Sequence, residues 1–91
     1  MKKNQEKAII AVKKARSTLD KIIDMMEKKK YCIDIVQQNL AVIGLLKSSN
    51  LSLLEDHLNC CFVDAARSGD KNKLDQMINE MTTVIKTAQN K

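Results

Sequence analysis

Apolar positions recur at helical spacing along nearly the whole chain, and the first series predicts an amphipathic helix near the N-terminus. Its steps alternate between four and three residues, through Ala8, Val12, Ala15, Leu19, Ile22 and Met26, with Ile9 and Ile23 widening the stripe. Asn4 is a candidate N-cap for this helix. The three lysines at 28–30 suit its carboxyl end, where cations meet the negative pole of the helix dipole.

A second apolar series predicts one long helix from about Tyr31 to Arg67. Its members are Ile33, Val36, Leu40, Ile43, Leu46, Leu51, Leu54, Leu58, Phe62 and Ala65. The weak helix formers at 48–50 leave an alternative open, because Ser52 and Glu55 form a capping-box pattern with which a new helix could begin. Since neither proline nor glycine stands there, we expect the helix to continue.

The last part of the chain predicts a turn and a third helix. The turn is the Ser-Gly-Asp sequence at 68–70. The helix is marked by Leu74, Met77, Ile78, Met81, Ile85 and Ala88. With no proline, two glycines and 44% hydrophobic but only 2% aromatic residues, the chain suits long aliphatic helices. We therefore expect a single all-α domain over residues 1–91, and its small size predicts that it oligomerises.

Positive charge is concentrated at the N-terminal end. Residues 1–30 hold ten of the 16 Lys and Arg residues but four of the 11 acidic ones, within a net charge of +5. Such a surplus attracts polyphosphates or anionic membrane surfaces, although helical proteins often carry lysine-rich faces that are merely solvated. No apolar run reaches the roughly 18 residues that a membrane span needs. The N-terminus also lacks the apolar core of a signal peptide, so we expect a cytoplasmic protein.

The candidate chemistry lies around the single histidine. Cys60 and Cys61 follow His57 by three and four residues, so on a helix both thiols flank the face that carries the imidazole. An odd number of cysteines argues against a disulfide framework and for reduced thiols with metal or redox roles. This group alone is a weak signal, because a lone histidine is more often structural and cysteines are often buried inertly.

Cys32 is the third candidate ligand, but it lies 25 residues before His57. A continuous helix rises ~1.5 Å per residue and would separate the two by roughly 37 Å. Metal bonds of about 2 Å allow no such gap. Either the chain folds back near residues 48–52, or the ligands come from different subunits. In an antiparallel pair related by a two-fold axis, Cys32 of one chain lies beside His57 and Cys61 of the other, which makes two sites per dimer.

Four segments of the chain resemble the core of the copper-sensitive operon repressor family, whose wider relatives include nickel, cobalt and formaldehyde sensors. They are Tyr31-Cys32-Ile33-Asp34-Ile35-Val36, Leu40-Ala41-Val42, Leu53-Leu54-Glu55-Asp56-His57-Leu58 and Cys61-Phe62. The similarity covers about residues 9–85. It implies a three-helix protomer, an antiparallel dimer with a four-helix core, and a tetramer built as a dimer of dimers.

The resemblance also implies roles for individual residues. Cys32 and Cys61 would be thiolate ligands and His57 the imidazole ligand, with Tyr31 in contact with the ligands rather than with the metal. Cys60 has no counterpart among the ligands. Two thiolates and one imidazole suit three-coordinate Cu(I), whereas a structural Zn(II) site usually takes a fourth ligand. The implied function is a repressor that binds operator DNA without metal and releases it when Cu(I) binds between subunits.

Three departures from the family pattern concern other positions. The copper branch commonly carries arginines associated with DNA binding where this chain has Ala11 and Ser48. Nearby basic residues are candidates to replace them, namely Lys13, Lys14, Arg16 and Lys47. A C-terminal glutamate of the family falls near Asp75 or Gln76.

These departures leave an alternative open, a helical metal-binding or thiol-reactive (persulfide) sensing protein with weak or lost DNA binding. Enzymatic activity is not expected, because one histidine, one tyrosine and no glycine-rich phosphate loop leave little for a catalytic group.

Overall fold

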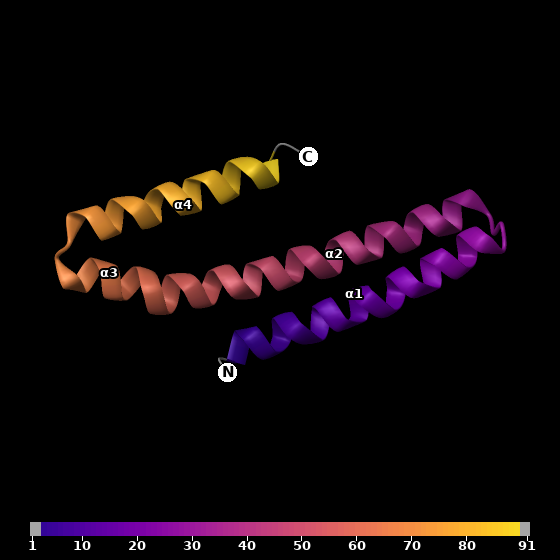
Figure 1. Cartoon of the computed structure of the whole chain (residues 1–91), viewed down its shortest axis with the longest axis horizontal. Coiled ribbons are helices and arrows are strands. Elements are labelled where there is room, and N and C mark those ends of the chain that lie inside the picture. The colour runs from indigo at the N-terminus through magenta and orange to yellow at the C-terminus, as the bar shows by residue number, and fades with distance from the viewer. Residues whose placement is uncertain (1–2, 90–91) are drawn as a thin grey trace. The chain divides into compact units, whose positions relative to one another are not determined.

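The computed structural model describes residues 3–89, and every secondary-structure element within them is helical. The elements are α1 (Lys3–Glu27), α2 (Cys32–His57), the π-helical turn η1 (Leu58–Phe62), α3 (Val63–Ser68) and α4 (Lys71–Gln89). Figure 1 labels α1, α2, α3 and α4. They divide between Asp56 and His57 into two compact units, called here the N-terminal and the C-terminal unit. The all-α prediction is confirmed.

In the N-terminal unit, α1 and α2 form an antiparallel hairpin (Figure 1). Its core contains Ala15, Ile22 and Val42, with Ile35 and Leu45 packed against them. Ala15 and Ile22 are seven residues apart, which places them on one face of α1. Alanine at such positions lets the two helix backbones approach closely. The amphipathic helix predicted from the first apolar series is therefore confirmed.

The connection between α1 and α2 is a Schellman motif. The amide of Lys30 donates to the carbonyl of Met25 at 2.9 Å, and the amide of Lys29 donates to the carbonyl of Met26 at 3.1 Å. Lys29 adopts the left-handed conformation that this motif requires, with φ of 54°. The lysines at 28–30 follow the helix as predicted. Asn4 lies inside α1, which begins at Lys3, so the prediction that Asn4 is the N-cap is wrong.

The long second helix continues through the serine-rich segment, as expected. Ser49 is only 4% exposed, and with Ala8 it lines a groove between α1 and α2. A small side chain is accommodated there without breaking the helix. The alternative start at Ser52 is not used, because Ser52 lies within α2.

The π-helical turn was not predicted from the sequence. Helical residues follow one another without a gap from Cys32 to Ser68, which agrees with the predicted end near Arg67. However, residues 58–62 form the wider π-type turn immediately after His57. Such turns are rare and often occur at functional sites.

In the C-terminal unit, a tight turn reverses the chain so that α4 packs beside α3. Gly69 has φ of 71°, a left-handed conformation that favours glycine. The Asp70 carboxylate then caps α4 by accepting hydrogen bonds from the amides of Asn72 at 3.0 Å and Lys73 at 3.3 Å. The predicted turn is confirmed. Within residues 3–89, none of the helices combines the length and apolar character needed to cross a membrane.

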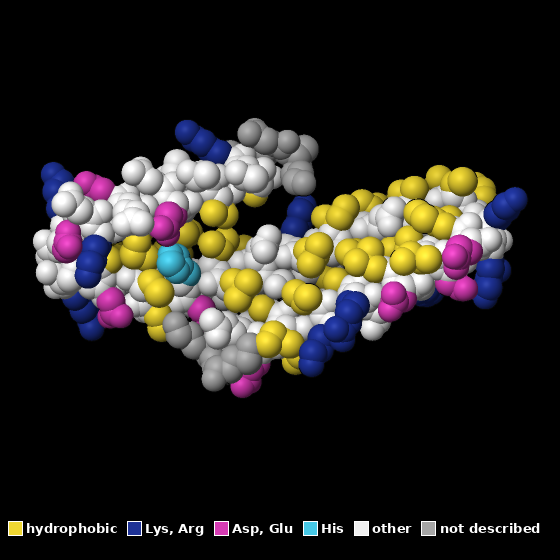
Figure 2. Space-filling view, in the orientation of Figure 1, with side chains coloured by type: hydrophobic (Ala, Val, Ile, Leu, Met, Phe, Trp, Pro, Cys, Tyr) yellow, Lys and Arg dark blue, Asp and Glu magenta, His cyan; other side chains and the backbone are white. Residues whose placement is uncertain are grey.

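Large apolar side chains remain exposed on the hairpin of the N-terminal unit, and Figure 2 shows many of them along α1 and α2. On α1 they include Ile10, Ile23 and Met26, and on α2 they include Ile33, Val36, Leu40 and Ile43. These side chains are between 48% and 60% exposed. The four on α2 share one face of that helix, and an exposed apolar row of this kind is typical of a protein interface.

Candidate metal centre and basic surface

His57 and Cys61 line one cavity in the C-terminal unit, which has a volume of about 340 Å³. The other residues that line it are Asp64, Ala65, Ser68, Lys73, Gln76, Met77 and Glu80. Cys60 is not among them. The imidazole and one of the two neighbouring thiols thus face the same space, and this thiol is the one that the resemblance predicted as a ligand.

The π-helical turn explains why the two adjacent cysteines differ. Its hydrogen bonds join residues five apart, which makes each turn wider than that of an α-helix. A residue four positions after His57 therefore remains on the side of the imidazole, whereas a residue three positions after it is rotated further away. A regular α-helix would instead place Cys60 and Cys61 on either side of the imidazole. Cys61 is exposed and Cys60 is partly buried.

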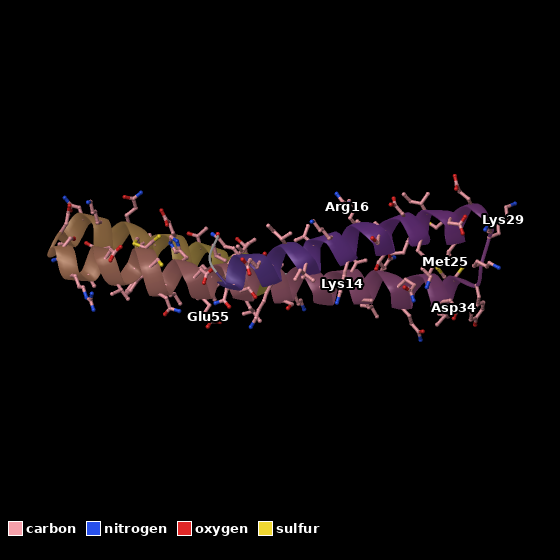
Figure 3. The ribbon with its side chains drawn as sticks, turned by 90° about the horizontal axis from the view of Figure 1, so that it is seen from below. Lys14, Arg16, Met25, Lys29, Asp34 and Glu55 are labelled. Atoms are coloured by element: carbon pink, nitrogen blue, oxygen red, sulfur yellow. The ribbon has the colours of Figure 1, made fainter. Side chains whose placement is uncertain are left out.

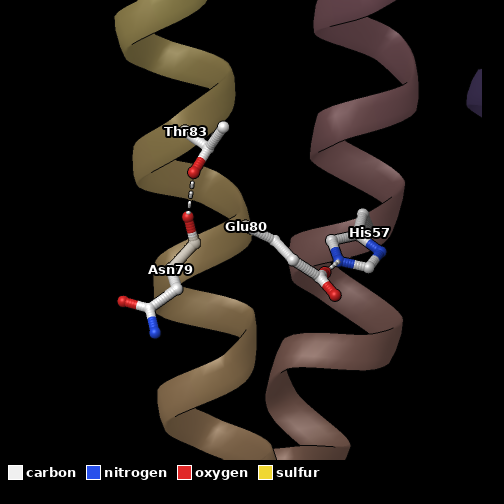
Figure 4. Close-up of polar contacts among 4 residues, drawn as sticks. All are labelled: His57, Asn79, Glu80 and Thr83. Atoms are coloured by element: carbon white, nitrogen blue, oxygen red, sulfur yellow. Dashed lines mark hydrogen bonds and ion pairs between the residues drawn. The ribbon is translucent and has the colours of Figure 1, made fainter.

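A carboxylate from α4 approaches the imidazole. Oε2 of Glu80 lies 3.8 Å from Nε2 of His57 (Figure 4). This distance is too long for a direct hydrogen bond but allows an ion pair when the imidazole is protonated. Because the side chains are 36% and 52% exposed, such a pair is weak. From the resemblance, the C-terminal glutamate of the family was predicted to fall near Asp75 or Gln76. In the structure Gln76 lines the cavity, Asp75 does not, and the carboxylate near His57 belongs to Glu80.

The third predicted ligand lies at the other end of α2, where Cys32 is the first residue and exposed. His57 is the last residue of this helix, and an unbroken helix of 26 residues separates its ends by roughly 37 Å. One chain therefore cannot bring the two together. Within residues 3–89, no three His, Cys, Asp or Glu side chains are grouped closely enough to hold a metal ion. Tyr31 directly precedes Cys32 and is 69% exposed.

The four basic residues predicted to bind DNA are all exposed, but they do not share one face. Lys14 and Arg16 leave α1 on different sides, as Figure 3 shows, because two residues of an α-helix span about 200°. Lys13 lines the groove between α1 and α2. Lys47 lies on the side of α2 opposite to buried Val42 and Ser49.

A different set of basic residues does share a face of α1. Lys7, Lys14 and Lys21 are seven residues apart and exposed, so they form a lysine row along the helix. The acidic residues of α1 lie outside this row, at Glu6, Asp20, Asp24 and Glu27. Lys7 and Lys21 were not among the residues predicted to bind DNA, although their regular spacing is visible in the sequence.

Comparison with known proteins shows the family. Residues 4–87 match the family described as metal-sensitive transcriptional repressor. This chain belongs to that family. The copper-sensing transcriptional repressor CsoR of Bacillus subtilis (strain 168) is 38% identical over 84 residues, which are 92% of this chain and 80% of that protein.

Mycobacterial members of the family are also similar. The copper-sensing transcriptional repressor CsoR of Mycobacterium ulcerans (strain Agy99) is 40% identical over 62 residues, 68% of this chain and 53% of that protein. The copper-sensing transcriptional repressor RicR of Mycobacterium tuberculosis (strain ATCC 25618 / H37Rv) is 44% identical over 48 residues, 53% of this chain. The aligned part spans about half the length of these two relatives. The family consists of transcriptional repressors, not enzymes.

Ala11 and Ser48, which stand where the copper branch of the family commonly carries arginine, have different surroundings. Ala11 is 9% exposed and lies on the α1 face that contacts α2. Ser48 is exposed on α2. A long charged side chain at position 11 would have to leave this packed interface to reach solvent.

Proposed function

We propose that the chain is a Cu(I)-responsive transcriptional repressor, which binds operator DNA without metal and releases it when Cu(I) binds a Cys-His-Cys site between subunits. The observation that supports this best is the cavity that receives His57 and Cys61 but not Cys60. Family membership and relatives named as copper-sensing repressors point to the same function.

The donor groups suit Cu(I). Thiolates and imidazole are ligands that a soft monovalent copper ion accepts in a three-coordinate arrangement. His57 and Cys61 offer one of each within a single cavity and leave one position for another donor. Tyr31, next to Cys32, is proposed to support the ligands from outside, and Cys60 is assigned no role.

The missing donor is proposed to be Cys32 of a second subunit. Two copies of α2 that run antiparallel place the beginning of one helix beside the end of the other. The exposed apolar side chains of α1 and α2 would form the interface. Two such dimers would form the tetramer, in which residues 1–91 act as one metal-sensing and DNA-binding domain in the cytoplasm.

Release of DNA follows from linkage between the two binding events. Drawing Cys32 of one subunit toward His57 and Cys61 of another shifts one long helix against its neighbour. If the shifted tetramer binds DNA less well, DNA must weaken metal binding by the same factor. We propose that the lysine row contacts phosphates, with Lys13, Arg16 and Lys47 as further candidates.

The ligand assignment is tested by binding measurements on cysteine variants. Wild-type protein should bind one Cu(I) per protomer in anaerobic competition with a chromogenic Cu(I) chelator. Cys32→Ser and Cys61→Ser should each abolish tight binding, because each removes a thiolate. Cys60→Ser is the matched control, since it changes the adjacent thiol, and it should bind like wild type. If Cys60→Ser destroyed the site and Cys61→Ser did not, the assignment would be wrong.

A further inference from the structure

A second sulfur atom is available in the cavity of His57 and Cys61, because Met77 from α4 also lines it. We infer that the Met77 thioether is a Cu(I) ligand. With His57 and Cys61 it gives one chain three donors, which hold Cu(I) until Cys32 of a second subunit replaces the thioether. This inference rests on the proposed function and adds a ligand to its site.

The pairing of the helices places Met77 opposite Cys61. Helix α4 runs antiparallel to η1 and α3. Among facing pairs, a higher residue number on η1 or α3 therefore goes with a correspondingly lower number on α4. His57 faces Glu80 (Figure 4), since Nε2 of His57 and Oε2 of Glu80 lie 3.8 Å apart. One helical turn further along η1 and one turn back along α4, the residues that face each other are Cys61 and Met77.

The lining of the cavity agrees with this register. Lys73, Met77 and Glu80 follow one another at steps of four and three along α4, and all three line the cavity. Asp64, another turn beyond Cys61, also lines it. The two sulfur residues therefore come from adjacent helices within one unit, and their approach needs no second subunit.

The chemistry of a thioether favours Cu(I). It is a soft, uncharged donor that needs no deprotonation, and soft sulfur ligands select Cu(I) over harder ions. Methionine has three rotatable bonds, so its sulfur can turn toward an ion from a partly buried position. Zn(II) is held by thiolate, imidazole and carboxylate groups. Met77 should therefore strengthen Cu(I) binding without affecting Zn(II) binding.

Met77 also belongs to the apolar stripe of α4, where leucine would pack equally well. Met77→Leu keeps this packing and removes only the sulfur. Met81→Leu is the matched control, because Met81 is also partly buried on α4, one turn further on, and does not line the cavity. Both changes are made in Cys32→Ser/Cys60→Ser protein, which leaves Cys61 as its single thiol.

We expect the parent double variant to keep weak Cu(I) binding in chelator competition. Met77→Leu should lower this affinity by about tenfold or more. Losing a residue that hydrogen-bonds to a metal ligand already has an effect of this size. Zn(II) affinity should stay unchanged, and Met81→Leu should match its parent. X-ray absorption of the Cu(I)-loaded parent should show two sulfur neighbours, a measurement that does not depend on the folding of a Met77 variant.

Unchanged Cu(I) affinity in Met77→Leu, or one sulfur neighbour in the parent, would overturn the Met77 assignment. Tight binding of Cu(I) by wild-type protein would in that case still support the proposed function. If wild-type protein bound no Cu(I), both proposals would be overturned.

Discussion

Lys29 shows how one residue sets the geometry of the hairpin. Its left-handed backbone closes the Schellman motif after α1, where glycine is the usual residue. A side chain in this conformation costs roughly 1–2 kcal/mol. Glycine avoids this cost but has more freedom in the unfolded chain. The position therefore offers a direct test of the connection between α1 and α2.

Lys29→Gly should stabilise the protein by about 0.5–1 kcal/mol, because the relief of strain exceeds the added unfolded-state entropy. Urea unfolding at one fixed protomer concentration measures this. Lys30→Gly is the control, since it removes the same charge at a residue without positive φ, and it should not stabilise. A Lys29→Gly protein no more stable than wild type would contradict the described turn.

Residue identity alone did not distinguish the two adjacent cysteines. The spacing from His57 placed both near the imidazole, and the choice of Cys61 came from the family resemblance. In the structure, too, Cys61 and not Cys60 lines the cavity with His57, because the π-helical turn η1 rotates Cys60 away from the imidazole. No sequence signal marked this turn, since π-type hydrogen bonding depends on how the surrounding helices pack.

At the scale of elements, apolar spacing predicted the helices well because their stripes are long and regular. The continuation of α2 through residues 48–50 followed from the absence of helix breakers. Glu80 and Met77 were not predicted as site residues, because they reach the cavity only through the docking of α4. Such contacts between distant segments cannot be read from local spacing.

The lysine row gives α1 a testable role. A plot of the logarithm of DNA affinity against the logarithm of salt concentration has a negative slope. Each lost phosphate contact should make this slope shallower by about one. Lys7→Gln, Lys14→Gln and Lys21→Gln should each have this effect and weaken operator binding. Lys86→Gln is the charge-matched control, because Lys86 is exposed in the last turn of α4 and is not among the proposed DNA contacts. Fluorescence anisotropy over a salt series measures these slopes, and an equal change of slope in Lys86→Gln would contradict the role of the lysine row.

At the scale of the whole molecule, the exposed apolar surface predicts an obligate oligomer. A small helical chain that leaves Ile33, Leu40 and Ile43 about half exposed has too small a core to be stable alone. Sedimentation at micromolar concentration should show a tetramer of 10.3 kDa chains. A single species of one chain's mass would refute this, and a stable dimer would restrict the assembly to one pair.

We propose that Cu(I) binding and DNA binding are coupled. A metal-free tetramer, with a formal charge of four times +5, should bind operator DNA with an affinity that falls steeply with salt. The most direct test measures, by fluorescence anisotropy, the affinity for DNA from upstream of the gene that encodes this chain. It is made with and without one equivalent of Cu(I) per protomer under anaerobic reductant. We predict much weaker binding with Cu(I). Equal affinity in both states would contradict the sensor function, and no binding without metal even at low salt would favour a metal-binding protein that does not repress.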